Sequence, residues 1–312
     1  MKSAINFVRG AVAKNEAIPI LTHIHVYDGR CQASNGRIVI DAPAPKLTGF
    51  NFTCPVKEFM LAIDNCDGEP DLSAKDGKLT VKSGKFKASL SMLPEEYPVM
   101  SANRAGAADI EIKILPVLRL LQPFISTDSN RPWSCGIFFD GNHAYATNNV
   151  VMLTTPCDDI GTINLSSACV DELLRIGEEP VAMLPEENSI IFFYDNGAWL
   201  KAMTLSTNWP DVSAFIPQSI EGIAITDEIK RDITRVAAFT DKNDQIHFGS
   251  HGISTQNEET IVEDYDFPES WFKGVHLCNV IRTATEIDFA KYPKPCPFIG
   301  ENIKGVIIGC LP

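Results

Sequence analysis

The 312-residue sequence predicts an α+β fold made of three repeated units, each with two helices and two groups of strands. Strand-like segments alternate with short amphipathic helical segments along the whole chain. Two sequence landmarks also recur at one common spacing. The 20 glycines and 20 prolines are spread throughout and indicate many turns, and the length suits two or three domains.

The first landmark is a strand that ends in an aromatic residue followed by Asp-Gly, found at 25–29 and again at 137–141. The second is an acidic or polar turn followed by an aromatic residue and proline, found at 93–98 and 206–210. Both dipeptides, Asp-Gly and aromatic-Pro, are repeated 112 residues further along the chain. Two independent landmarks with one offset indicate a duplicated unit.

The first unit is predicted to begin with a helix within 2–16, whose apolar face contains Ile5, Val8 and Val12. After the Asp-Gly hairpin, a second helix is expected at 56–65. A strand pair at 78–81 and 85–90 follows, with Ser-Gly as its turn.

The second unit repeats this order. Its first helix lies within 111–131, although Pro116 and Pro123 disfavour a regular helix there. A second helix is expected at 167–176, and a strand pair at 189–194 and 199–204. The apolar face of the first helix is formed by Leu115, Leu118, Leu121 and Ile125.

The third unit matches less closely. Thr226 is a predicted N-cap for a helix at 227–239, and a strand at 246–249 follows. A helix at 270–284 and a final strand at 303–311 complete the unit, which is predicted to be shortened and to lack a strand before Ile246. The linkers 101–109 and 217–221 give domains at 1–104, 105–217 and 218–312.

Composition excludes several classes of protein. The net charge of −13 argues against a protein that binds nucleic acid tightly over its whole surface. Nine cysteines without C-x-x-C spacing argue against a disulfide framework and a zinc ribbon, and favour a reducing cytoplasm. No apolar run reaches 18 residues and no signal peptide is evident, so we expect no membrane association.

Three segments carry a family resemblance: 18–21 (Ile-Pro-Ile-Leu), 91–98 (Ser-Met-Leu-Pro-Glu-Glu-Tyr-Pro) and 209–217 (Trp-Pro-Asp through Ile-Pro). In this order and spacing they resemble the bacterial β sliding clamp, the processivity subunit of DNA polymerase III, in a short phage-type version. The resemblance covers essentially the whole chain and is thinnest in the third unit.

The resemblance implies a ring of six domains, in which helices line a central hole and sheets form the outer layer. A three-domain chain would then be a head-to-tail homodimer that encircles double-stranded DNA and tethers a DNA polymerase and clamp-loader subunits. It implies no enzyme activity, no cofactor and no metal. Counted over 2–16, 55–67, 111–131, 168–179, 227–242 and 269–282, the helices and their ends contain 14 of the 27 basic residues but only 15 of the 40 acidic ones, so the lining is relatively basic.

DNA contact is expected from basic side chains of the first helices and from the loop after the third helix. Trp133 in that loop could stack on DNA or pack internally, and solvated helix faces would carry similar charges. The candidate DNA-binding residues are Arg9, Lys14, Arg119, Arg131, Trp133, Lys230, Arg231 and Arg235.

The resemblance also implies an apolar groove that binds short peptide motifs of partners. An apolar chain end beside an apolar hairpin fits such a groove, although the last strand could simply be an inner strand. Asn-Asn-Val-Val at 148–151 replaces the family's Asp-Gly-His-Arg, which is a departure from the family at the position expected to recognise the partner's motif. The candidate groove residues are Thr147, Asn149, Val150, Val151, Met152, Pro217, Val306, Ile308, Gly309 and Cys310.

Other patterns favour structural roles. Five lysines between Lys75 and Lys87 are interpreted as protection of a sheet edge. His23 and His25 share a strand face but lack a third metal ligand, and paired glutamates at 95–96, 186–187 and 258–259 lie in turns. Two alternatives stay open: a β-rich structural or interaction protein, such as a phage particle component, and a carbohydrate-active enzyme.

Overall fold

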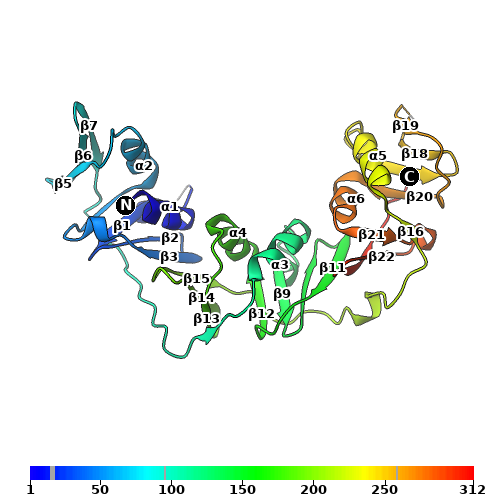
Figure 1. Cartoon of the computed structure of the whole chain (residues 1–312), viewed down its shortest axis with the longest axis horizontal. Helices are drawn as coiled ribbons and strands as arrows, with labels where there is room; N and C mark the ends of the chain where they lie inside the picture. The colour runs from blue at the N-terminus through cyan, green and yellow to red at the C-terminus, as the bar shows by residue number, and fades with distance from the viewer. Residues whose placement is uncertain (15–17, 95, 258) are drawn as a thin grey trace. The chain divides into compact units, whose positions relative to one another are not determined.

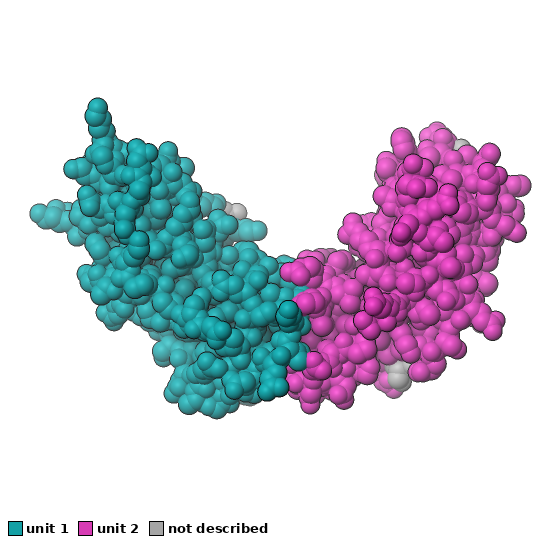
Figure 2. Space-filling view, in the orientation of Figure 1, with its two compact units in different colours: residues 1–115, 168–204 teal, residues 116–167, 205–312 magenta. Residues whose placement is uncertain are grey.

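The computed structural model describes residues 1–14, 18–94, 96–257 and 259–312. Six α-helices and four antiparallel sheets among these residues confirm the predicted α+β class (Figure 1). The chain divides into two compact units, residues 1–115 with 168–204 and residues 116–167 with 205–312 (Figure 2). This division passes through the predicted middle domain, whose strands are shared between the two units.

The first compact unit contains an eight-stranded and a three-stranded sheet. Helices α1 (Lys2–Val8), α2 (Val56–Asp64) and α4 (Ser167–Ile176) belong to it, apart from the first residue of α4. The eight strands are, in order, β4 (Phe52–Pro55), β1 (His23–Tyr27), β2 (Arg30–Ser34), β3 (Ile38–Pro43), β15 (Trp199–Met203), β14 (Ser189–Phe193), β13 (Ala182–Pro185) and β8 (Ala108–Asp109). The three strands are β5 (Asp71–Lys75), β6 (Lys78–Ser83) and β7 (Phe86–Ser91).

The second compact unit contains an eight-stranded and a four-stranded sheet. Its helices are α5 (Asp227–Ala237), α6 (Gly274–Ile281) and most of α3 (Ile114–Leu121). The eight strands are β12 (Thr162–Ser166), β9 (Gly136–Asp140), β10 (His143–Thr147), β11 (Val151–Pro156), β23 (Lys304–Ile307), β22 (Cys296–Gly300), β21 (Ala284–Ile287) and β16 (Ile223–Ala224). The four strands are β19 (Ile261–Val262), β18 (Gly252–Thr255), β17 (Gln245–Gly249) and β20 (Ser270–Lys273).

The strand order repeats three times. In each four-strand group, the last strand in chain order lies beside the first. The three groups are β4-β1-β2-β3, β12-β9-β10-β11 and β20-β17-β18-β19. Three three-strand groups accompany them: β5-β6-β7, β13-β14-β15 and β21-β22-β23. The expectation that the third unit lacks a strand before Ile246 is therefore wrong, because its four-strand group is complete. What is shortened is the edge strand β19, with two residues.

The sequence landmarks occupy equivalent places in the fold. The Tyr97 ring stacks on His25 of β1 with centroids 5.1 Å apart, and Trp209 stacks on Phe138 of β9 at 5.2 Å. The aromatic residue before each repeated proline thus covers the first strand of its own four-strand group. This shared packing explains why the two landmarks keep one offset.

Neighbouring repeats are joined by the last strands of their groups. β3 pairs antiparallel with β15, with Asp41 opposite Trp199 at one end and Ile38 opposite Ala202 at the other. β11 pairs in the same way with β23, with Thr154 opposite Lys304 and Val151 opposite Ile307. β7 and β19 hold the corresponding last positions in their groups, and each has a neighbour on one side only among the described residues.

The first helix of each of the first two repeats is shorter than predicted. α1 ends at Val8, a 3-10 turn follows at 9–11, and Val12 is extended, so it does not continue the helix. The Arg175 guanidinium donates to the carbonyls of Asn6 and Phe7, at 2.8 and 2.6 Å, and satisfies the helix end. In α3, Pro116 sits in the first turn, where no backbone donor is needed, and Pro123 lies in the following 3-10 turn at 122–124.

The predicted helix at 270–284 is wrong at its beginning. Residues 270–273 form strand β20 and pair with β17, and only 274–281 are helical. Trp271 and Phe272 fit a strand because the Phe272 ring is fully buried while Trp271 lies on the other face, where it stacks on His247 at 4.3 Å. By contrast, the predicted N-cap at Thr226 is confirmed, because its hydroxyl accepts from the Ile229 amide at 3.2 Å.

None of the described helices has the length and apolar character needed to cross a bilayer.

Replacing Gly252 by alanine should destabilise the short edge strand β19. Gly252 has a φ of +124°, and an added Cβ would collide with the backbone carbonyl of Val262. Gly36→Ala is a matched control, because Gly36 has a φ of +81° with open space around it. We expect Gly36→Ala to cost about 1 kcal/mol from backbone strain, and Gly252→Ala clearly more, in urea unfolding. Equal losses would contradict the close packing of β18 on β19.

Candidate partner groove and DNA-contact sites

Three predicted groove residues lie side by side on one sheet face. Thr147 of β10 is paired with Met152 of β11, and Met152 is paired with Val306 of β23. Side chains directly opposite each other in neighbouring strands point to the same face. Val151 points to the other face, where it is fully buried with its partner Ile307. Only the backbone of Val151 can therefore border a groove on the face of Met152.

The chain end continues this sheet face. The Ile308 amide donates to the Val150 carbonyl at 2.9 Å, one step beyond the last pair of β11 and β23. Ile308 is 44% exposed, whereas Met152 is only 7% exposed, so Ile308 is the more accessible apolar side chain. The exposed apolar surface thus lies at the end of β23.

The last residues are tied to the third repeat. The Cys310 amide donates to the Trp271 carbonyl at 2.8 Å, and the Tyr292 hydroxyl donates to the Cys310 carbonyl at 2.8 Å. Gly309 is needed here, since an added Cβ would lie 2.6 Å from the Tyr292 ring. The predicted tail residues Gly309 and Cys310 therefore have fixed positions next to Ile308.

The turn between β10 and β11 is held by side-chain hydrogen bonds. Asn149 adopts a φ of +69°, and its amide oxygen accepts from Arg131 at 2.8 Å. The Asn148 side chain lies 3.2 Å from His276 Nδ1 at the start of α6. This turn therefore joins a predicted DNA-contact residue, Arg131, to the predicted groove.

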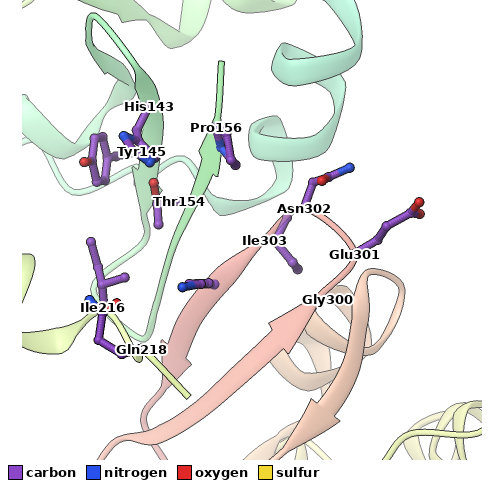
Figure 3. A pocket seen from close by; sticks show the side chains of 11 residues that line it. His143, Tyr145, Thr154, Pro156, Ile216, Gln218, Gly300, Glu301, Asn302 and Ile303 are labelled. Atoms are coloured by element: carbon purple, nitrogen blue, oxygen red, sulfur yellow. The ribbon is translucent and has the colours of Figure 1, made fainter. Parts of the chain in front are cut away.

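Pro217 lies in a segment that forms one wall of a pocket of about 420 Å³ (Figure 3). Its neighbours Ile216 and Gln218 line the pocket together with Tyr145 and Thr154. Tyr145 and Thr154 are paired with each other and lie two residues from Thr147 and Met152, hence on the same sheet face. The remaining lining residues are His143, Pro156, Gly300, Glu301, Asn302, Ile303 and Lys304. Sequence analysis missed this pocket, although the two-residue alternation along β10 and β11 points to it.

Four of the predicted DNA-contact residues are exposed and form no ion pair with a described residue: Arg9, Lys14, Arg119 and Arg131. Lys230 on α5 is half-buried. These side chains keep their charge available to an anionic ligand such as a phosphate.

Trp133 is packed rather than free. Its ring lies edge-on to Trp209 with centroids 4.9 Å apart, and its carbonyl accepts from Asn164 at 2.9 Å. The structure thus shows the packing that the sequence allowed, while stacking of this partly exposed side chain on DNA stays a prediction.

The basic side chains of α5 are partly neutralised. Arg235 and Arg231 approach the buried Asp232 carboxylate at 3.0 and 3.7 Å. The same carboxylate accepts from the Tyr265 hydroxyl at 2.9 Å. Burial and this hydrogen bond raise the pKa of Tyr265 to about 12. Arg231 and Arg235 thus contribute less free charge than the sequence suggests.

The two histidines of β1 have separate partners. His25 Nε2 lies 3.0 Å from the Asn51 side-chain oxygen, and His23 Nδ1 lies 3.0 Å from the Pro19 carbonyl. Within the described ranges, no group of three His, Cys, Asp or Glu side chains is arranged to bind a metal ion. The predicted glutamates 95 and 258 lie outside the described residues.

The fold as a whole is that of the bacterial DNA sliding clamps. No family model and no curated protein matches the sequence. Among solved structures, the sliding clamp from Bacillus subtilis has a TM-score of 0.79 at 18% identity, with 100% of this chain and 97% of that chain covered. The DNA polymerase beta subunit of Streptococcus pyogenes gives 0.80 at 18% identity, with the same coverage. The sliding clamp from Caulobacter crescentus gives 0.78 at 19% identity, again covering 100% and 97%. The resemblance inferred from the sequence is thus confirmed at the level of the fold.

His276 should titrate below its ordinary pKa of 6.5, because burial disfavours its charged form. The depressed pKa means that its contribution to stability is complete above pH 6.5 and is lost as the pH falls through the folded-state pKa. NMR titration should show this, and His276→Gln should flatten the stability profile below pH 6.5. A His276 pKa at or above 6.5 would contradict the partial burial of its ring.

Proposed function

We propose that this protein is a DNA sliding clamp, a non-enzymatic processivity factor that encircles duplex DNA and tethers replication proteins. The observation that carries the proposal is the match to clamp structures over the whole chain, combined with two equivalent, half-paired strands, β7 and β19. The proposed setting is DNA replication in a cytoplasm.

In this proposal, domains 1–104, 105–217 and 218–312 make half of a six-domain ring. Each junction within the chain pairs the last strand of a four-strand group with the last strand of the next three-strand group. By the same rule, β19 of one copy would pair antiparallel with β7 of a second copy. Two such contacts close a two-fold ring, whereas one alone would build a filament.

The charges near these two edges are complementary. Near the β7 edge, Lys82 of β6 lies opposite Lys87 of β7, and Asp71 of β5 lies on the other side of Lys82. Like charges in directly opposed positions destabilise a sheet unless an anion compensates them. None of these lysines, nor Lys85, forms an ion pair with a described residue. The acidic residues around β19, namely Glu259, Glu263, Asp264 and Asp266, would supply that compensation in a second copy.

Topological binding fits the overall charge. A net charge of −13 makes tight phosphate binding by the whole surface unfavourable, but an encircling ring needs only a lining that does not repel DNA. We assign that lining role to Arg9, Lys14, Arg119, Arg131 and Lys230. Arg231 and Arg235 would contribute less, and Trp133 would support the loop that carries Arg131.

Partner tethering is assigned to the groove on the second compact unit. Thr147, Met152 and Val306 form its floor, and Val150, Pro217, Ile308, Gly309 and Cys310 its borders. Burying two or three apolar side chains of a partner peptide there would give about 1.5–3 kcal/mol each before ordering costs. The proposed partners are a DNA polymerase and clamp-loader subunits.

The protein should have twice its chain mass of 34.3 kDa in solution, because two copies are needed to close the proposed ring.

The protein should stay on DNA only while the DNA has no free end. After loading onto a nicked circle, labelled protein should co-elute with the circle in gel filtration. Cutting the circle once with a restriction enzyme should release it. Binding to a short duplex should be weak and decrease with salt. Equal retention on circular and cut DNA would contradict encirclement.

A further inference from the structure

The two junctions between repeats can be compared position by position. At the first junction, the register places Gln32, Asp41 and Trp199 in one row across β2, β3 and β15. At the second junction, Tyr145, Thr154 and Lys304 form the same row across β10, β11 and β23. Equivalent places in one fold thus carry different chemistry.

The first junction is closed by a segment of the chain itself. The Gln32 side chain donates to the Met100 carbonyl at 2.7 Å and accepts from the Met100 amide at 2.8 Å. Behind it, the fully buried Asp41 carboxylate accepts from Tyr27 at 2.6 Å and from Gln32 at 3.1 Å. The fold therefore provides its own example of an extended segment lying across this row.

The second junction keeps this place open. Thr154 is only 4% exposed, and its hydroxyl has the Tyr145 hydroxyl as a polar neighbour but completes no hydrogen bond with a described residue. Lys304 forms no ion pair within the part of the chain that the structure describes. Both residues line the pocket of about 420 Å³ (Figure 3). A buried, unsatisfied hydroxyl and an unpaired cation in one pocket favour a ligand with oxygen acceptors.

We propose that this pocket is a subsite for a carboxylate carried by an extended segment of a partner protein. The carboxylate pairs with Lys304 and accepts from Thr154, while Pro156 and Ile216 contact the adjoining apolar atoms. The inference rests on the proposed function, because the pocket lies on the same sheet face as Thr147, Met152 and Val306. One extended peptide can therefore occupy the groove and the pocket together.

The acidic side chains near the pocket do not prevent a carboxylate from binding there. The Asp140 carboxylate already accepts from the Tyr145 hydroxyl at 2.8 Å and from the amides of Asn142 and His143 at 3.1 and 2.8 Å. Glu301 lies at the exposed turn between β22 and β23, where solvent screens it. Lys304 is the cation among the lining residues, with His143 as the second group that can carry positive charge.

Fluorescent synthetic peptides test the proposal in the full-length protein. All share an apolar half of alternating Leu and Ala, and they differ in the other half. One carries Glu side chains and an amidated end, one carries Gln and an amidated end, and one carries Gln and a free terminal carboxylate. Fluorescence anisotropy is measured with wild type, Lys304→Gln, Lys304→Arg and Ile308→Asp. Lys294→Gln, at an exposed lysine away from the pocket, is the matched control.

We expect wild type to bind a carboxylate peptide about tenfold more tightly than the amide peptide. Whichever of the two carboxylate peptides shows this preference identifies the source as a side chain or a chain end. Lys304→Gln should abolish the preference without weakening the amide peptide, whereas Lys304→Arg and Lys294→Gln should retain it. Ile308→Asp should weaken all three peptides.

Three results would overturn the proposal. A preference for carboxylate that survives Lys304→Gln places the carboxylate elsewhere and leaves the groove intact. Failure of all three peptides to bind wild type removes the groove itself, and with it this part of the proposed function. A Lys304→Gln variant that changes the sedimentation of the free protein means that a second copy, rather than a partner peptide, occupies the pocket.

Discussion

Pairing of strand edges is the constraint on which the rest of the structure depends. An unpaired edge exposes a row of backbone N–H and C=O groups that can form hydrogen bonds with another strand. This chain satisfies two such edges internally, by pairing β3 with β15 and β11 with β23. In the proposed ring, the same rule pairs β7 of one copy with β19 of the other. A fold whose repeats join through backbone hydrogen bonds tolerates wide sequence change, which is consistent with a full-length structural match at 18–19% identity.

The repeat could be predicted from the sequence because the conserved spacing has a physical cause. Tyr97 and Trp209 each cover the first strand of their repeat, so their distance from the hairpin is fixed. Helix ends were less predictable. Val12 continues an apolar pattern, but the carbonyls of Asn6 and Phe7 end the helix by binding Arg175, which is 168 residues or more away in the chain. The pattern of residues 270–273 fits both a helix and a strand, and pairing with β17 makes this segment a strand.

The candidate groove was predicted only in part, for a similar reason. The resemblance identified the strands but not which face each side chain takes, so Val151 was grouped with Met152 although their side chains point to opposite faces. Likewise, the sequence predicts Arg231 and Arg235 to be free charges, whereas the structure places the buried Asp232 carboxylate beside them. Tyr145, Thr154 and Lys304 were missed because they come together only through strand register. Long-range pairing, rather than local pattern, determines each of these features.

Hydrogen–deuterium exchange across a range of protein concentrations tests most directly the claim that β7 and β19 close the ring. We expect amide exchange in Phe86–Ser91 and Ile261–Val262 to slow together as the two-copy mass appears. Exchange in Asp71–Lys75, the opposite edge of the β7 sheet, should stay unchanged. If the protein reaches the two-copy mass while β7 and β19 exchange at their monomer rates, the ring is not closed by these strands and the account is wrong.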